Sequence, residues 1–263
     1  MLGVAEPTAY DLRFRLLGIP VRVHPLFWLI MAVLSGQDNN LPGVLIFIAC
    51  GFVSILVHEF GHGLTARFFG YRSSEIVLFW MGGYCACDLD RQRPGQRLAV
   101  LAAGPGAQLL LLAVVFLIGR LAFGITLADD LELIGALFGF GTGRGMSMAF
   151  FTLTPLMRQA YVVMTVINLM WALLNLLPIL PLDGGRITEV ALTMLNRRNG
   201  MRWAHIVSLL TAGSLAMVFF RWEQIGPGIW FAYFAFRNYQ ILQALHHSAR
   251  YGQAEDDADW WKR

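Results

Sequence analysis

One run of residues has the types and spacing that suit hydrolytic chemistry, namely His58-Glu59-Phe60-Gly61-His62. Two histidines four residues apart lie on the same face of a helix, so His58 and His62 can present their imidazoles to one metal ion. Glu59 flanks that face, close enough to a metal-bound water to accept its proton. Zinc lowers the pKa of such a water to about 7. The run therefore predicts a zinc hydrolase with Glu59 as the general base.

The environment of this run adds weight to the prediction. The run lies in a long apolar segment, residues 43–69, where ionisable groups are costly to bury and need a partner or a function. The alternative is that these side chains only form hydrogen bonds between helices. The cost of burying ionisable groups in a membrane makes that alternative the weaker of the two.

A third ligand is expected, because catalytic zinc usually takes three protein ligands and keeps one position open. Asp183 is the candidate, in the run Asn175-Leu-Leu-Pro-Ile-Leu-Pro-Leu-Asp183-Gly-Gly-Arg186. The two prolines break a helix, and the two glycines permit unusual backbone dihedrals, so Asp183 can turn inward. The alternative is an ordinary helix end that carries a loop carboxylate. The expected depths in the membrane favour a metal site shared by His58 and Asp183. His58 lies about 22 Å along a span that runs inward, and Asp183 lies at the inner end of another span, so both reach a similar depth on the same side.

Composition indicates a membrane protein. Hydrophobic residues make up 57% of the 263 residues, charged residues only 14%, and the mean hydropathy is +0.57. Soluble domains carry about 25% charged residues. We expect an all-α polytopic membrane protein with about six transmembrane helices, at residues 23–36, 43–69, 98–123, 160–180, 203–220 and 228–245. Glycines interrupt the apolar stretch 131–153, which predicts a re-entrant or interfacial segment.

The loop after the second span has the pattern of a β-hairpin. Two β-prone runs, residues 75–81 and 84–88, flank Gly82 and Gly83. The first run is continuously apolar, so we expect the hairpin to be associated with the membrane.

The distribution of basic residues predicts the orientation. With both termini in the cytoplasm, the inner side receives most of the 20 Lys and Arg residues, as the positive-inside rule requires. These are Arg13, Arg15, Arg22, Arg67, Arg72, Arg91, Arg93, Arg97, Arg186, Arg197, Arg198, Arg202, Arg250, Lys262 and Arg263. We therefore expect a protein of the cell (inner) membrane. Its expected parts are a cytoplasmic N-terminal segment (1–22), a single membrane-embedded domain (23–249, catalytic core 43–186) and a polar C-terminal tail (250–263).

The motifs together resemble one known family. His-Glu-Phe-Gly-His, Ala103-Gly-Pro-Gly106 and the run 175–186 are similar to the site-2 protease (M50 peptidase) family, over about residues 43–186. The resemblance implies an intramembrane zinc metalloprotease that binds one zinc ion and cleaves transmembrane or membrane-proximal segments near the cytoplasmic side. It implies that His58, His62 and Asp183 are ligands, Glu59 is the base, Asn175 holds substrate or the oxyanion, and Gly82 and Gly83 lie in a substrate-pairing strand.

Some features depart from that family or argue against other classes. There is no insertion long enough for a PDZ domain and no extension long enough for a CBS pair, so a compact form is expected. Gln108 stands where many relatives have Asn. The basic residues lack the clustered pattern of nucleic-acid binding, and Cys50, Cys85 and Cys87 form no disulfide framework.

The expected partners are a lipid bilayer and a membrane-protein substrate with a transmembrane segment. The remaining alternatives are a catalytically silent scaffold that keeps the zinc site, and a transporter, although a transporter usually has repeated halves with broken helices.

Overall fold

The computed structural model describes residues 6–36, 40–71, 73–80, 82–87, 93–141 and 145–258, with the backbone alone for Ser73, Ser74 and residues 247–258. The chain divides into two compact units, Met1–Leu174 and Asn175–Arg263, which are described separately below.

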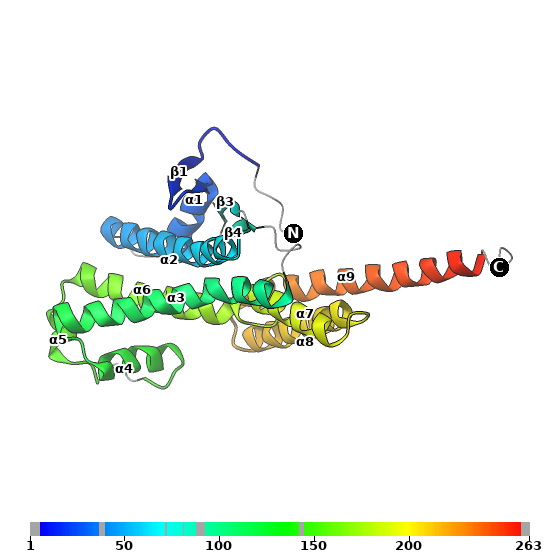
Figure 1. Cartoon of the computed structure of the whole chain (residues 1–263). Helices are drawn as coiled ribbons and strands as arrows, with labels where there is room; N and C mark the ends of the chain where they lie inside the picture. The colour runs from blue at the N-terminus through cyan, green and yellow to red at the C-terminus, as the bar shows by residue number, and fades with distance from the viewer. Residues whose placement is uncertain are drawn as a thin grey trace. The chain divides into compact units, whose positions relative to one another are not determined.

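The first unit is built on three long helices. These are α2 (Leu41–Phe68), α3 (Pro94–Phe123) and α6 (Pro155–Asn175), the last of which ends at the first residue of the second unit. Helices α2 and α3 pack side by side (Figure 1). Polar groups join α2 to α6, because Gln159 donates to the Gly43 carbonyl at 3.2 Å and Asn168 donates to the Ser54 hydroxyl at 3.1 Å.

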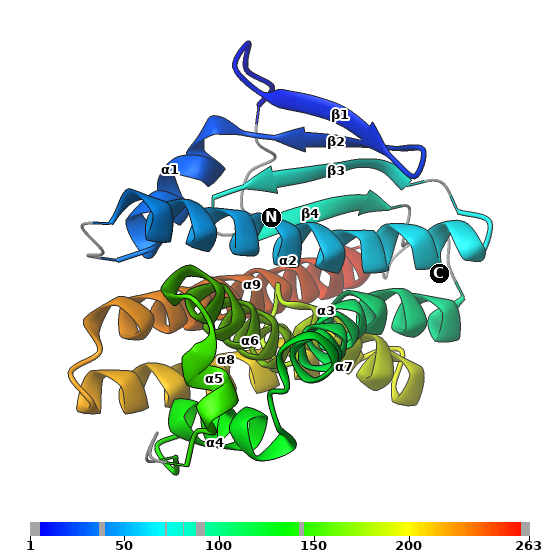
Figure 2. The ribbon, with the colours of Figure 1, turned by 90° about the vertical axis from the view of Figure 1, so that its left-hand side faces the viewer.

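A four-stranded sheet completes this side of the unit. Its order is β1 (Leu12–Leu16), β2 (Ile19–Val23), β3 (Ser73–Phe79) and β4 (Gly82–Cys87), with β2 and β3 parallel and the other pairs antiparallel. Figure 2 shows the four strands running along α2, and both β3 and β4 contact that helix. The short helix α1 (Pro25–Leu34) follows β2 directly. Apolar residues of β2, β3, α1 and α2 form the core between them, among them Val23, Phe27, Ile55 and Ile76.

The hairpin expected after the second span is confirmed as β3 and β4, but β1 and β2 were missed, so the all-α assignment is wrong in this respect. The missed signal is the apolar alternation of Leu12, Phe14 and Leu16 with two arginines, which has the period of two of a strand. The two-residue loop Leu17-Gly18 has φ values of 50° and 76°. Positive φ at both positions belongs to a type I′ hairpin turn, whose twist matches the flanking strands.

Ionic contacts hold these first strands in place. The buried Arg22 lies 3.2 Å from Asp11 and 3.4 Å from Glu75 on β3, and Arg67 of α2 donates to the Leu17 carbonyl at 2.6 Å. Burial by itself would raise the pKa of Asp11, but hydrogen bonds from Thr8 and the Arg22 guanidinium outweigh it and hold the pKa at about 2. The N-terminal hairpin is therefore tied to β3 and to α2.

The segment between α3 and α6 folds into two short helices, α4 (Leu127–Leu137) and α5 (Met148–Thr152). Asp129 is buried in the first turn of α4 and accepts hydrogen bonds from Thr126 and Ser147. Its neighbour Asp130 pairs with Arg120 at 2.6 Å and accepts a hydrogen bond from the Tyr161 hydroxyl. These contacts fix the connection against α3 and α6. The segment expected at residues 131–153 includes parts of both short helices, and its re-entrant or interfacial position stays a prediction.

The second unit contains α7 (Asp183–Leu195), α8 (Gly200–Arg221) and α9 (Ile225–Ala258). Helices α8 and α9 pack closely along each other (Figure 1), and α7 packs on α8. Their shared core includes Ile179, Ala212, Phe231 and Phe234. Since α9 runs to Ala258, residues 250–258 of the expected tail continue that helix, and residues 259–263 lie outside the described part of the chain.

Within the described residues, four helices are long and apolar enough to cross a membrane, namely α2, α3, α6 and α8. They match four of the six expected spans. The first expected span contains only the ten residues of α1, about 15 Å of helix against a hydrocarbon core of about 30 Å, because the preceding residues pair as β2. The last, α9, is long but carries Arg237, Asn238, Gln240 and Gln243. Six spans are therefore not confirmed.

Candidate metal centre

The histidines and the glutamate of the first motif lie on α2, in its C-terminal half. His58, Glu59 and His62 are all buried, with exposed fractions of 3%, 4% and 8%. The spacing of four residues places the two imidazoles on one face, where His58 Nε2 and His62 Nε2 are 3.1 Å apart. The structure thus brings both predicted imidazole ligands together.

The other nitrogen of each ring is held by a hydrogen-bond acceptor. His58 Nδ1 lies 3.0 Å from Gln108 Oε1, and His62 Nδ1 lies 2.7 Å from the Val100 carbonyl. The Gln108 amide nitrogen faces the Ser54 carbonyl at 3.5 Å, so its oxygen is the atom that faces His58. Because neither oxygen can donate, each Nδ1 carries the proton, and both Nε2 lone pairs point into the shared space. Hydrogen bonds of this kind, with residues that do not themselves bind the metal, orient metal-binding histidines.

The contact between Gln108 and His58 leads to a testable expectation. Replacing Gln108 with Leu keeps a side chain of similar size but removes the acceptor, so the His58 ring loses its fixed orientation. Loss of such a partner typically lowers metal affinity by about 10- to 100-fold. Zinc affinity, measured by competition with a chelator, should fall by that amount, whereas Leu110→Ala on the exposed side of α3 should leave it unchanged. Equal affinities for both variants would refute this role of Gln108.

Two glycines allow α3 to lie directly against the histidines. A Cβ atom on Gly61 would come within 2.3 Å of the Ala103 carbonyl oxygen, so the helices can approach this closely only with glycine there. A Cβ atom on Gly104 would come within 2.3 Å of His62 Nε2 and 2.9 Å of His58 Nε2. The missing side chain of Gly104 therefore keeps the space at the two Nε2 atoms open.

In the second unit, Asp183 is the first residue of α7, after the turn that ends α6. The first turn of a helix favours a carboxylate because of the positive end of the helix dipole. Gly184 and Gly185 lie directly under the preceding loop, since a Cβ atom on either would come within 2.3 Å of backbone atoms of Leu176 or Ile179. The break expected from the prolines and glycines is confirmed.

Buried polar side chains of α8 and α9 form hydrogen bonds with both the backbone amide and the backbone carbonyl of Leu180 in this loop. The Leu180 amide donates to the Ser208 hydroxyl at 3.0 Å, and Asn238 donates to the Leu180 carbonyl at 2.9 Å. His205 Nδ1 lies 2.7 Å from Asn238 Oδ1 and fixes the orientation of that amide. The loop that leads to Asp183 is thus fixed within its own unit.

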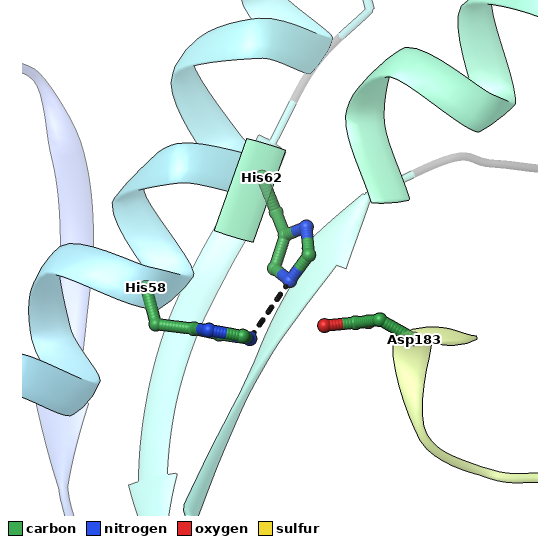
Figure 3. A group of neighbouring side chains, drawn as sticks. All are labelled: His58, His62 and Asp183. Atoms are coloured by element: carbon green, nitrogen blue, oxygen red, sulfur yellow. Dashed lines mark hydrogen bonds between the residues drawn. The ribbon is translucent and has the colours of Figure 1, made fainter. Parts of the chain in front are cut away.

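His58, His62 and Asp183 form a group that could hold one metal ion. One ligand atom from each residue lies within 4.8 Å of the others, and Figure 3 shows the two imidazoles and the carboxylate facing one space. Two neutral imidazoles, a carboxylate and an open position are the ligand set of a catalytic zinc site. Because the Nδ1 atoms carry the protons, both Nε2 lone pairs are available to such an ion. The absence of a side chain at Gly104 leaves space for the ion beside them.

The remaining predicted residues lie on neighbouring elements. Gly83 of β4 passes against Glu59, because a Cβ atom there would come within 2.8 Å of Glu59 Cγ and 3.0 Å of its Oε1. Gly82 begins the same strand, and its Cβ atom would meet the Trp171 ring at 3.4 Å. Asn175 is the last residue of α6 and is nearly buried. The backbone of β4 therefore lies beside the carboxylate of Glu59.

Residues that hold the site in place were not identified from the sequence. Gln108 was noted only as a departure from relatives, and His205 was not among the predicted site residues. The signal was present, since buried amides and imidazoles in apolar helices need a partner or a function. Which partner each one has depends on the tertiary structure.

Comparisons with known proteins agree on one family. A model of peptidase family M50 matches residues 46–219. The zinc metalloprotease MJ0392 of Methanocaldococcus jannaschii is 28% identical over 188 residues, which are 70% of this chain and 46% of that protein. The putative zinc metalloprotease sll0528 of Synechocystis sp. is 31% identical over 187 residues, 66% of this chain and 42% of that protein. The chain thus spans less than half the length of these two relatives.

Two further matches cover more of the chain. Stage IV sporulation protein FB of Bacillus subtilis is 22% identical over 236 residues, 87% of this chain and 68% of that protein. The solved structure of a site-2 protease from Methanocaldococcus jannaschii matches with a TM-score of 0.54 and 22% identity, over 89% of this chain and 95% of that one. At this level of identity the likeness concerns the fold.

Proposed function

Because the chain belongs to peptidase family M50, we propose that it is an intramembrane zinc metalloprotease that cleaves transmembrane or membrane-proximal segments of membrane proteins near the cytoplasmic side. The observation that carries the proposal is the arrangement of His58 and His62 on α2. Their Nε2 atoms face each other at 3.1 Å, and both Nδ1 atoms lie against acceptors, inside a helix apolar enough to span a bilayer. Such a pair suits a metal ligand set better than a structural contact.

In this proposal His58, His62 and Asp183 hold one zinc ion, which when bound supplies a Lewis acid for the scissile carbonyl and lowers the pKa of its water. Glu59 accepts the proton of the attacking water and delivers it to the leaving amine. Asn175 would donate its amide hydrogens to the substrate or to the developing oxyanion. The near-complete burial of Glu59 keeps bulk water away from this proton transfer.

Strand β4 is the element that we propose for substrate binding. It lies at one end of the strand order, so an unwound substrate segment can add to its edge by β-augmentation. Gly82 and Gly83 would allow the substrate backbone to approach closely. Because Gly83 passes against Glu59, a segment paired there would bring its peptide bonds close to the proposed base.

Two other functions use the same site differently. A silent scaffold would bind a partner helix and keep the zinc site only as a fold element. A transporter would need polar residues along a path through the membrane, and usually a second broken helix in a repeated half. The presence of Glu59 beside the histidines favours the enzyme, since neither a scaffold nor a transport path needs a proton acceptor at that position.

The direct test is to co-express the protein with a panel of tagged single-span membrane proteins, with His58→Ala as the matched inactive variant. Cleaved fragments should appear with the wild-type protein and be absent with the variant. If the zinc-loaded wild-type protein cleaves no member of a broad panel, the scaffold is the better account.

We further propose that the protein resides in the cell (inner) membrane with both termini in the cytoplasm, from the distribution of basic residues. In a background with the native cysteines replaced by serine, a cysteine at Asn40 should react with an impermeant thiol reagent added outside the cell. A cysteine at Asn199 should react only after the membrane is opened. Both positions are exposed in the structure, so burial does not account for a difference. The reverse labelling would overturn the orientation.

A further inference from the structure

A pair of thiols lies on β4 outside the metal centre. Cys85 and Cys87 are free cysteines, both partly exposed, and their Sγ atoms are 2.8 Å apart. Residues two apart in a strand point to the same face, which explains how the two side chains meet. The proximity is close enough for one thiol to donate a hydrogen bond to the other, as in a thiol–thiolate pair.

The thiols share a face of β4 with Gly83. Since a Cβ atom on Gly83 would contact Glu59, this is the face that lies against α2. Cys85 also packs on the apolar core that contains Phe60, the residue that follows Glu59. A change at the thiol pair would therefore act on the part of β4 that lies beside the proposed base.

We propose that Cys85 and Cys87 form a redox-responsive dithiol site whose closure to an intramolecular disulfide displaces β4 and slows proteolysis. This regulatory role rests on the proposed function, whereas the thiol chemistry does not. The oxidant is a low-molecular-weight disulfide. One thiolate attacks it and releases one reduced thiol, forming a mixed disulfide. The second cysteine then loses its proton, attacks the mixed disulfide and releases the second reduced thiol.

The two cysteines are suited to different parts of this exchange. The hydrogen bond from Cys85 lowers the pKa of Cys87, although burial opposes it, and the same hydrogen bond together with burial raises the pKa of Cys85. Cys87 therefore supplies the first thiolate, because the thiolate is the attacking form. Cys85 is the resolving thiol.

Closure must change the strand. Alternate residues of an extended strand are about 6.6 Å apart, and their Cβ atoms are separated by a similar distance. A disulfide brings the Cβ atoms to about 3.8 Å. The bond would therefore pull the backbone of Ala86 out of the extended form. The pairing of β3 with β4 is already irregular at Ala86, since Cys87 pairs with Ser73 and Cys85 with Ile76. We therefore expect the backbone hydrogen bonds of the hairpin to break first at this irregularity.

The test uses the full-length, zinc-loaded protein equilibrated with mixtures of reduced and oxidised glutathione. After acid quenching and denaturation, free thiols are alkylated and the peptide that contains residues 85–87 is analysed by mass spectrometry. We expect both thiols to disappear together with the loss of two hydrogens, and Cys50 to remain alkylated. Cys85→Ser and Cys87→Ser should form no such product, while Cys50→Ser should behave as the wild-type protein.

Two further readouts separate the disulfide from its consequence. Oxidation should speed hydrogen exchange of the Tyr84–Cys87 amides, and it should slow cleavage of a substrate that the reduced protein cleaves. The expected slowing is about 10- to 100-fold, since a displacement of about 1 Å near the reacting groups can cost 100-fold. Cys85→Ser should cleave the substrate at the same rate in the reducing and in the oxidising mixture.

Several outcomes would overturn the proposal. One is the absence of an intramolecular disulfide in the most oxidising mixture. A second is a disulfide that leaves hydrogen exchange in β4 unchanged. A third is a second equivalent of zinc that shields both thiols from alkylation, which would make the pair a thiolate metal site. Failure of the proposed function is distinguishable, because the reduced protein would then cleave nothing while the disulfide still formed.

Discussion

Replacing Glu59 with Gln is expected to abolish detectable proteolysis while zinc content and fold are retained. The amide has nearly the same size as the carboxylate and can still form hydrogen bonds, so the packing against Gly83 changes little. It cannot accept a proton at neutral pH, so it can neither activate the water nor protonate the leaving amine. Loss of general acid–base catalysis typically costs about 10²- to 10⁴-fold in rate.

The measurement compares the rate of substrate cleavage by the two proteins, with zinc analysis of the same preparations. Retained zinc ensures that a loss of activity reports on Glu59 and not on the metal ligands. If the Glu59→Gln variant binds zinc and cleaves as fast as wild type, another group is the base.

Replacing Gly104 with Ala, which adds one methyl group, is expected to lower zinc affinity strongly. The new Cβ atom would lie 2.3 Å from His62 Nε2 and 2.9 Å from His58 Nε2, so at least one imidazole must move. Moving the His62 ring also breaks its hydrogen bond to the Val100 carbonyl. Because loss of one outer partner alone costs up to about 100-fold in metal affinity, Gly104→Ala should lower zinc affinity by about 100-fold or more.

Gly106→Ala is the matched control for this variant. Gly106 lies two residues further along α3, and a Cβ atom there would meet nothing within 4 Å. Both substitutions have the same effect on helix propensity, so any difference in zinc affinity reports on the space at the histidines. Similar zinc affinities for the two variants would mean that the imidazoles do not bind the metal in the arrangement described.

The parts of the site that follow from local sequence could be predicted. The spacing of His58 and His62 fixes their common face on any helix, and the prolines and glycines around Asp183 fix the break before α7. The hairpin β3–β4 was predicted for a similar reason, since its turn and its β-prone residues are close together in the chain. These features depend little on distant residues.

The parts that depend on contacts between distant residues could not be predicted. Gln108 is 50 residues from His58, and Asn238 is 58 residues from Leu180, so only the folded structure reveals these pairs. The strand β2 pairs in parallel with β3, which lies far along the chain, and residues 19–22 were instead assigned to the cytoplasmic N-terminal segment. A pairing of this kind leaves a weak signal in the sequence.

The most direct test of the account is the zinc content of the purified protein and of Asp183→Ala, with Glu189→Ala on the same helix as a control. Asp183 is the residue proposed to complete the ligand group with His58 and His62, so the variant tests that assignment. We predict about one zinc ion per chain in the wild-type and control proteins, because three ligands and a water satisfy tetrahedral zinc, and almost none in Asp183→Ala. Full zinc content in Asp183→Ala would contradict the account.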